Sequence, residues 1–421
     1  TGNCGSSNLD VAAYLRFIDS LKLSINVATL VGHNDVREKA MGKDARDPTP
    51  QETREMESIV EKAMRDGAVG FSTGLIYTPG NYSKTPEIVG LAKIAARYHG
   101  VYTTHMRDEG DSVTEAIEEA LQVATAANIP LEISHFKLSG QQNWGRSKET
   151  VPMIENARKR GIDVTIDQYP YTASSTSIST LLPDEILANG QDSVNARLSR
   201  PDIRKYVTTY ILGKLKKRKL SHLGYAVIAN YETDSTYNGK SIEQVNLMLG
   251  RRHTAASEAE TVMDIMMHGG ATAVFHGMSE EDVRRIMKYP YNMFASDASI
   301  RQFGVGVPHP RGYGTNARVL AEYVRKQHVI SLEDAVRRMT SLPAQKFGLH
   351  DRGIIAPGYA ADLVIFDEAT VQDRSTYAHP HAYSTGFQVV IVNGRLTVEG
   401  GKHLGVRAGQ ALYGPGANTK H

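Results

Sequence analysis

The chain has 421 residues, of which 41% are hydrophobic and 22% are charged, a composition typical of globular proteins. This length exceeds that of one small domain and suits a barrel with an accessory unit. A net charge of +2 indicates neither a nucleic-acid-binding surface nor an acidic tail. No apolar stretch reaches the roughly 18 residues that a transmembrane helix needs, so we expect no membrane partner.

The single cysteine excludes an internal disulfide, and the cysteine count either indicates a reducing compartment or is neutral. Residues 1–9 lack the basic start and apolar core of a signal peptide. We therefore expect a cytoplasmic location, unless a signal precedes Thr1. A basic run at 214–219 lacks interleaved aromatic residues and is interpreted as the solvated face of a helix. Nothing in the sequence predicts the oligomeric state.

Strand and helix patterns alternate along most of the chain, as in a parallel sheet with crossover helices. Capping boxes at Thr49/Glu52 and Ser112/Glu115 predict the starts of two of these helices. The predicted strands are short and apolar on both faces, which favours a (β/α)8 barrel over a one-sided sheet. These strands are 25–33, 68–75, 101–106, 131–136, 162–169 and 292–297, with a seventh placed just before Cys4.

A barrel needs eight strands, so we expect the first strand to lie upstream of Thr1, in a natural protein longer by several tens of residues. The predicted barrel occupies 1–346. Residues 176–270 are far too many for an ordinary connection, and patterns at 195–219 and 241–267 predict a mostly helical insertion beside the strand ends. Glycine turns and β-rich segments after Phe347 predict that 347–421 form the C-terminal part of a small β domain.

Residues able to bind a metal stand where predicted strands stop: His105, His135 and Asp297, with Cys4 near the start of the chain. In a (β/α)8 barrel the carboxyl ends of all strands open onto one face, so these residues can converge. Thiolate and imidazole are zinc ligands, and a catalytic zinc site keeps one position open for water. The metal polarises a carbonyl and lowers the pKa of water, while Asp297 is either a weaker ligand or the group that handles the proton.

Further polar groups follow the same strand ends: Lys137, Tyr169, Ser175 and Arg311. Arg311 is a candidate for a bidentate clamp on a substrate carboxylate. His33 and His276 also end strand-like runs, and we interpret both as structural because nothing pairs with them in the sequence.

The segments GNCG, GFSTGLIYTPG, THMRDE, ISHFK, DQYPYTASS, ASDAS with PHPRGYGT, and ADLVIFD with VNG together resemble the D-aminoacylases, N-acyl-D-amino-acid deacylases of the amidohydrolase superfamily. The resemblance extends from residue 1 to about 400. It implies that Cys4, His105 and His135 are tight zinc ligands and that Asp297 is the catalytic carboxylate, which also touches a second metal position. It further implies that Tyr77 belongs to the acyl-side pocket and that Lys137, Tyr169, Ser175 and Arg311 bind the substrate carboxylate and its surroundings. Members of the family carry a His-x-His pair on the first strand, and none precedes Cys4.

We therefore expect zinc-dependent hydrolysis of the amide bond of small N-acyl-D-amino acids. A cyclic-amide hydrolase of the dihydroorotase or hydantoinase type is a second hypothesis. Those enzymes usually bridge two metals with a carboxylated lysine on the fourth strand, and AVGFSTGL contains no lysine. A third hypothesis is an inactive fragment or binding protein with the same fold.

Overall fold

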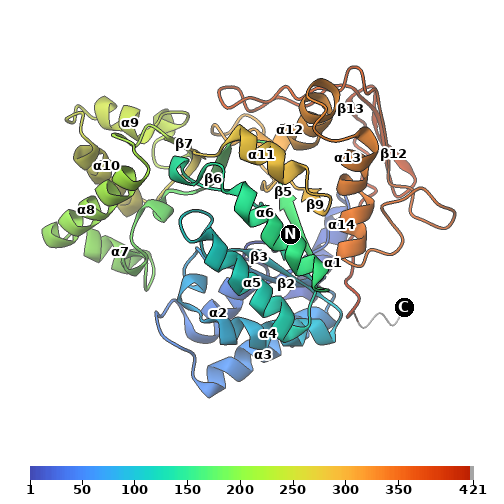
Figure 1. The fold of residues 1–421 in the computed structure, drawn as a ribbon, viewed down its shortest axis with the longest axis horizontal. Coiled ribbons are helices and arrows are strands. Elements are labelled where there is room, and N and C mark those ends of the chain that lie inside the picture. The colour runs from blue at the N-terminus through green and yellow to red at the C-terminus, as the bar shows by residue number, and fades with distance from the viewer. Residues whose placement is uncertain (418–421) are drawn as a thin grey trace.

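A parallel β-sheet forms the centre of this computed structural model, which describes residues 1–417 (Figure 1). Within these residues, six strands join in the order β1-β2-β3-β4-β5-β9. Their bounds are β1 Val31–Gly32, β2 Gly70–Gly74, β3 Val101–His105, β4 Leu131–Ile133, β5 Val164–Gln168 and β9 Asn292–Phe294. Every residue of these strands is buried, so both faces of the sheet are covered as predicted, although several of the buried residues are polar, among them Thr73, Glu132 and Asp167.

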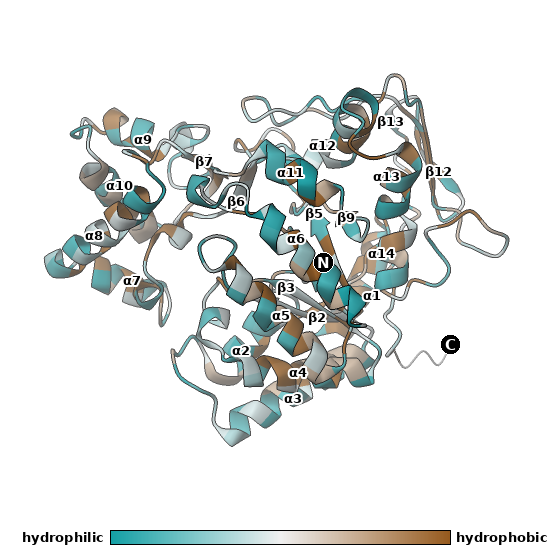
Figure 2. Cartoon of the chain, in the orientation of Figure 1, coloured by the Kyte–Doolittle hydropathy of each residue, from teal (hydrophilic) through white to brown (hydrophobic). Residues whose placement is uncertain are grey.

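Amphipathic helices follow the strands and cover the sheet. Brown hydrophobic and teal hydrophilic residues alternate along α3, α4 and α5 in Figure 2. The Thr49/Glu52 capping box is present at the start of α3, whereas the Ser112 side chain makes no cap hydrogen bond at α5. The backbone N–H of Ser112 instead donates to Asp108. The helices are α1 Val11–Leu21, α2 His33–Met41, α3 Pro50–Arg65, α4 Thr85–Arg97, α5 Val113–Ala127 and α6 Ser147–Lys159, with short 3-10 turns at η1 Gly80–Tyr82 and η2 Gln141–Asn143.

The residues before Cys4 do not form the seventh strand that the sequence predicts. Thr1 nevertheless makes two backbone hydrogen bonds that follow the pattern of parallel strands. Its amino group donates to the Ala28 carbonyl at 2.6 Å, and its carbonyl accepts from the Leu30 N–H at 2.9 Å. The segment that carries Cys4 therefore starts alongside the chain that leads into β1.

Residues 173–276 contain a separate antiparallel sheet and a group of helices with its own apolar core. The helices form the lobe on the left of Figure 1. The two long helical patterns of the sequence are each broken. Pro201 begins α8, because proline is favoured at a first helical position, and Gly250 follows α9 with a positive φ of 68°. The sequence did not predict the sheet. The elements are β6 Ala173–Ser177, η3 Ile178–Leu181, η4 Asp184–Ile186, α7 Gln191–Leu198, α8 Pro201–Lys217, β7 Ala226–Asn230, η5 Ser235–Tyr237, α9 Ile242–Met248, α10 Ala255–Met267 and β8 Thr272–His276.

Helices flank β9, and a second antiparallel sheet follows them at the right of Figure 1. The chain then returns to the central sheet, where Ala411 forms a parallel bridge with Val27 in the segment before β1.

The division of the chain at about 176–270 and at 346/347 stays a prediction. Among residues 1–417, no helix combines the length and apolar character needed to cross a bilayer. The remaining elements are α11 Glu280–Met287, α12 Arg311–Arg318, the π-helix η6 Val319–Lys326, α13 Leu332–Met339, α14 Ser341–Lys346, β10 Leu363–Phe366, β11 Phe387–Val392, β12 Arg395–Glu399 and β13 Lys402–His403.

Candidate active site

The proposed metal ligands come from strand ends on one edge of the central sheet. His105 is the last residue of β3, His135 follows β4, and Asp297 follows β9. Cys4 joins them from the segment beside β1. All four residues line one cavity of about 260 Å³. Parallel strands place their carboxyl ends on the same edge, and the chain in this way brings together residues almost 300 positions apart.

Three of these residues have a left-handed backbone, which is uncommon for residues other than glycine. The φ angles are 53° at Cys4, 41° at His135 and 47° at Asp297. Such conformations cost about 1–3 kcal/mol and gather at functional sites. At His135 the backbone N–H donates to Asp167 Oδ1 at 2.6 Å. At Cys4, close approach requires a glycine, because a Cβ at Gly74 would lie 2.1 Å from the Cys4 carbonyl oxygen.

Cys4, His105 and His135 form a compact group of metal-binding atoms. Cys4 Sγ lies 3.3 Å from His135 Nε2, and one ligand atom from each of the three residues falls within 4.8 Å of the other two. Both ring nitrogens of His105 are buried without a hydrogen-bond partner among the described residues. Burial lowers the pKa of His105 to about 3, so its imidazole is neutral and able to bind a metal. This donor set fits zinc.

Glu109 and Lys137 surround the far side of the His135 ring. His135 Nδ1 lies 2.8 Å from Lys137 Nζ and 2.9 Å from Glu109 Oε1, and the Glu109–Lys137 ion pair measures 2.5 Å. Burial opposes ionisation of Glu109, yet Lys137 and the two histidines hold the pKa of this carboxyl well below its usual range. A proton on His135 Nδ1 bonded to Glu109 leaves Nε2 free to face Cys4, the arrangement of a carboxylate–histidine–metal triad.

The negative groups around His135 favour a positive charge there. Burial and Lys137 oppose protonation of this ring, but Glu109, Asp297 and Cys4 raise the pKa of His135 well above its usual value. A metal ion would supply the same positive charge.

The sequence analysis did not identify Glu109 as a site residue. The motif THMRDE places Glu109 four residues after His105, where a turn can direct its side chain back to the end of the strand.

Asp297 contacts Arg311 and stands outside the group of three ligand atoms. Arg311 Nη1 lies 2.6 Å from Asp297 Oδ2, and Arg311 Nη2 donates to the Ser175 carbonyl at 3.2 Å. Burial would raise the pKa of Asp297, but Arg311, followed by His135 and Lys137, lowers it. The predicted metal contact of Asp297 stays a prediction.

Tyr169 lines the cavity and lies near two cations. Its ring centre is 4.6 Å from the Arg311 guanidinium and 5.7 Å from Lys137 Nζ. The hydroxyl is buried and has no hydrogen-bond partner within residues 1–417. Tyr169, Lys137 and Arg311 therefore offer donors to an anionic group in the cavity. Ser175, on β6, lines the same cavity, and its backbone carbonyl accepts a hydrogen bond from Arg311.

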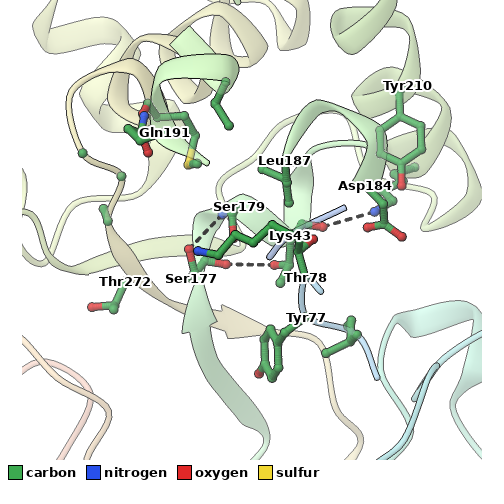
Figure 3. Close-up of a pocket in the computed structure, with 18 of the residues that line it drawn as sticks. Lys43, Tyr77, Thr78, Ser177, Ser179, Asp184, Leu187, Gln191, Tyr210 and Thr272 are labelled. Carbon is green, nitrogen blue, oxygen red and sulfur yellow. Dashed lines mark hydrogen bonds between the residues drawn. The ribbon is translucent and has the colours of Figure 1, made fainter. Parts of the chain in front are cut away.

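Tyr77 separates this cavity from a larger one of about 1180 Å³, and its side chain lines both. Its hydroxyl lies 3.0 Å from Thr176 Oγ1, and its ring lies 4.9 Å from that of His105. Figure 3 shows Tyr77 at the edge of the larger cavity, with Ser177 and Leu187 of the insertion across from it. The predicted role of Tyr77 in the acyl-side pocket stays a prediction.

The basic run at 214–219 is not simply a solvated helix face. Lys214 and Lys217 line both cavities, and Lys214 Nζ donates to the Thr180 carbonyl at 3.2 Å. The sequence alone does not reveal this position, because only the tertiary structure shows that the end of α8 faces the two cavities.

His33, which the sequence analysis interpreted as structural, is buried and lies 2.8 Å from Glu87.

Comparison with known proteins agrees with this fold. The model of the amidohydrolase family matches residues 242–398. The chain is 36% identical over 385 residues to an N-acyl-D-glutamate deacylase of Alcaligenes xylosoxydans xylosoxydans, which covers 91% of this chain and 69% of the relative. The crystal structure of a D-aminoacylase superposes with a TM-score of 0.81 at 32% identity, covering 98% of this chain and 82% of the other.

The N-acyl-D-glutamate deacylase of Bordetella bronchiseptica, whose structure contains zinc and a phosphonate inhibitor, gives a TM-score of 0.80 at 32% identity, covering 98% of this chain and 81% of that one. A parallel sheet with histidines at its strand ends, together with these similarities, defines an amidohydrolase. The chain belongs to the D-aminoacylase family, whose members hydrolyse linear amide bonds. The predicted fold class and the predicted enzyme class are both confirmed.

Proposed function

We propose that this chain hydrolyses small N-acyl-D-amino acids to a carboxylate and a free D-amino acid. One observation carries the proposal: the Cys4, His105 and His135 donors open onto the same cavity as Arg311 and Tyr169. The metal-binding residues thus lie beside cationic side chains. An amide substrate with a free α-carboxylate needs both, because the metal acts on the amide and the cations bind the carboxylate. The names of the relatives support the same substrate class.

The metal we propose is zinc, held by Cys4, His105 and His135. The unpartnered nitrogens of His105 and the sulfur of Cys4 beside His135 support this choice. When bound, zinc polarises the scissile carbonyl and lowers the pKa of water. Glu109 orients His135 through Nδ1, which keeps Nε2 directed toward Cys4.

The anchor for the substrate carboxylate consists of Arg311, Tyr169 and Lys137. The Arg311 guanidinium carries five N–H donors, so it can bind a carboxylate with the donors that Asp297 and the Ser175 carbonyl do not use. The Tyr169 hydroxyl adds a neutral donor that the protein leaves unused. Binding of the carboxylate here directs the amide toward the metal-binding group, while the acyl chain extends past Tyr77.

Asp297 handles the proton in this scheme. Its low pKa keeps it ionised at neutral pH, so it can accept a proton from water. It then gives that proton to the amine as the amide C–N bond breaks. The negative charge that develops on the substrate oxygen lies in a cavity lined by cationic side chains, which stabilises it.

A turnover assay with the zinc-loaded chain tests the proposal. N-acetyl-D-amino acids with acidic and with apolar side chains serve as substrates, and the L-enantiomers and dihydroorotate serve as controls. We expect release of free amine from D-substrates alone. Opening of dihydroorotate would favour a cyclic-amide hydrolase, and zinc binding without turnover of any substrate would favour an inactive protein with this fold. We also propose a cytoplasmic location, which fractionation of the source cells would test.

A further inference from the structure

A second cluster of metal-type side chains lies in the insertion. His222 precedes β7, Glu243 is in the first turn of α9, His253 lies between α9 and α10, and Glu258 is in the first turn of α10. None of these residues lines the cavities beside Cys4 and Tyr77. We propose that His222, Glu243, His253 and Glu258 bind a zinc ion, or a similar divalent transition metal, that stabilises this part of the protein. The inference is independent of the proposed amide hydrolysis.

The four ligand atoms converge closely. His222 Nδ1 lies 2.6 Å from Glu258 Oε1, and His253 Nε2 lies 2.6 Å from Glu243 Oε1. The two pairs meet, because His222 Nδ1 is 3.9 Å from Glu243 Oε1 and all four ligand atoms fall within 4.8 Å of one another. Two imidazoles and two carboxylates form a four-ligand set that suits zinc.

The charge balance of the cluster favours a divalent ion. Glu258 is completely buried, and its second oxygen accepts from the Leu223 N–H at 2.6 Å. A buried carboxylate needs a compensating cation. The rings of His222 and His253 are stacked with centroids 4.3 Å apart, so each presents a nitrogen to the same pair of carboxylates.

Two arginines close to the cluster in the sequence have other partners. Arg251, next to the loop that carries His253, is paired with Asp264 at 2.5 Å, and Arg218 stacks on Tyr225 with its guanidinium 5.0 Å from the ring centre. A single divalent ion neutralises both carboxylates and leaves both imidazoles neutral. The four side chains then act as ligands of one centre.

The backbone around the cluster accommodates this convergence. A Cβ at Gly224 would lie 2.6 Å from Glu243 Oε2, so a glycine at 224 lets the carboxylate approach the loop beside His222. The ligands come from two loops and the first turns of two helices. A metal here would join the α9–α10 pair to the chain entering β7, and these segments share one apolar core.

Metal counting on the full chain tests the proposal. The protein is stripped with a chelator, incubated with excess zinc and passed through a desalting column before elemental analysis. We expect His253→Ala and Glu243→Gln each to bind one zinc ion fewer per chain than the wild type. The matched control is His268→Ala, an exposed histidine of the same insertion whose Nδ1 lies 2.7 Å from the Asp264 carbonyl. The control should bind as much zinc as the wild type.

A stability measurement gives a second readout. Zinc should raise the Tm of a Cys4→Ala protein, in which the cluster of the insertion is left to bind the ion. It should not raise the Tm of Cys4→Ala/His253→Ala. Equal zinc contents in the wild type, His253→Ala and Glu243→Gln would overturn the proposal and leave the cluster as two ion pairs. Because activity is not the readout, failure of this inference is distinct from failure of the proposed hydrolysis.

Discussion

Arg311 Nη1 and Asp297 Oδ2 lie 2.6 Å apart at the edge of the cavity that also contains Cys4, His105 and His135. The contact joins the start of α12 to the loop that follows β9. It gives Arg311 two tasks in the proposed function, since the guanidinium keeps Asp297 ionised and binds the substrate carboxylate. Substitutions of the two residues should therefore have different effects.

Asp297→Asn should lower kcat by about 10²–10⁴-fold, because the amide cannot accept or return the proton. The zinc content should equal that of the wild type, since Asp297 stands outside the group of three ligand atoms. Steady-state kinetics and elemental analysis measure the two effects. Asp202→Asn, at an exposed ion pair with Arg200 away from both cavities, is the control and should keep its activity. Loss of zinc from Asp297→Asn would show instead that this carboxylate is needed for metal binding.

Arg311→Lys should raise KM for N-acyl-D-amino acids by about tenfold, equivalent to about 1.4 kcal/mol, because a planar pair of donors becomes a point charge. The effect on kcat should be smaller. Arg352→Lys, at an ion pair with Asp362 in the C-terminal part, controls for the loss of a guanidinium elsewhere. An unchanged KM would assign Arg311 the structural task of holding Asp297 and Ser175.

Cys4→Ala should bind one zinc ion fewer per chain and lose its activity, because the thiolate is a proposed ligand. Elemental analysis and the turnover assay should report the two losses together. Circular dichroism should show an unchanged fold. Zinc content equal to that of the wild type would refute the assignment of Cys4 as a ligand.

Glu109→Gln should weaken zinc binding by about 10–100-fold, as expected when the carboxylate that orients a metal-binding histidine is removed. Competition with a zinc-binding dye measures the affinity. Glu119→Gln is the matched control, because Glu119 lies on α5 and pairs with Arg107 outside the metal-binding group. If both variants bound zinc as tightly as the wild type, Glu109 would serve mainly to neutralise Lys137.

Glu87 should make the free energy of unfolding depend on pH in the acidic range. This carboxylate lies 2.8 Å from His33 Nε2 and 2.5 Å from Arg37 Nη1, and all three side chains are buried. Burial would raise the pKa of Glu87, but His33 and Arg37 lower it below the ordinary value of 4.5. Because the folded pKa is the lower one, the stabilisation is fully present above pH 4.5 and is lost as the pH falls through the folded pKa.

Glu87→Gln should therefore lower the free energy of unfolding by about 3–5 kcal/mol at neutral pH, since it leaves a buried cation without its partner. The difference from the wild type should shrink in acid. Urea denaturation at several pH values measures it, with the exposed Glu55→Gln as control. A difference that stayed constant with pH would mean that Glu87 stabilises by packing alone.

The sequence by itself determined the alternation of strands and helices and the class of enzyme. Buried parallel strands are typically rich in apolar residues on both faces, and this local pattern can be recognised in the amino-acid sequence alone. It also placed His105, His135 and Asp297 at strand ends, because parallel strands all finish on one edge of a sheet. The capping box at Thr49 and Glu52 is equally local and forms as predicted.

The tertiary structure decided how the side chains meet. The contact of Glu109 with His135 and the approach of Lys214 to the cavity depend on loop paths that no periodic pattern encodes. The left-handed backbone at His135 depends on the hydrogen bond with Asp167 from the neighbouring strand. The cluster around His222 depends on how α9 packs on α10. Contacts of this kind follow from the relative placement of whole elements, which local propensity leaves undetermined until the core packs.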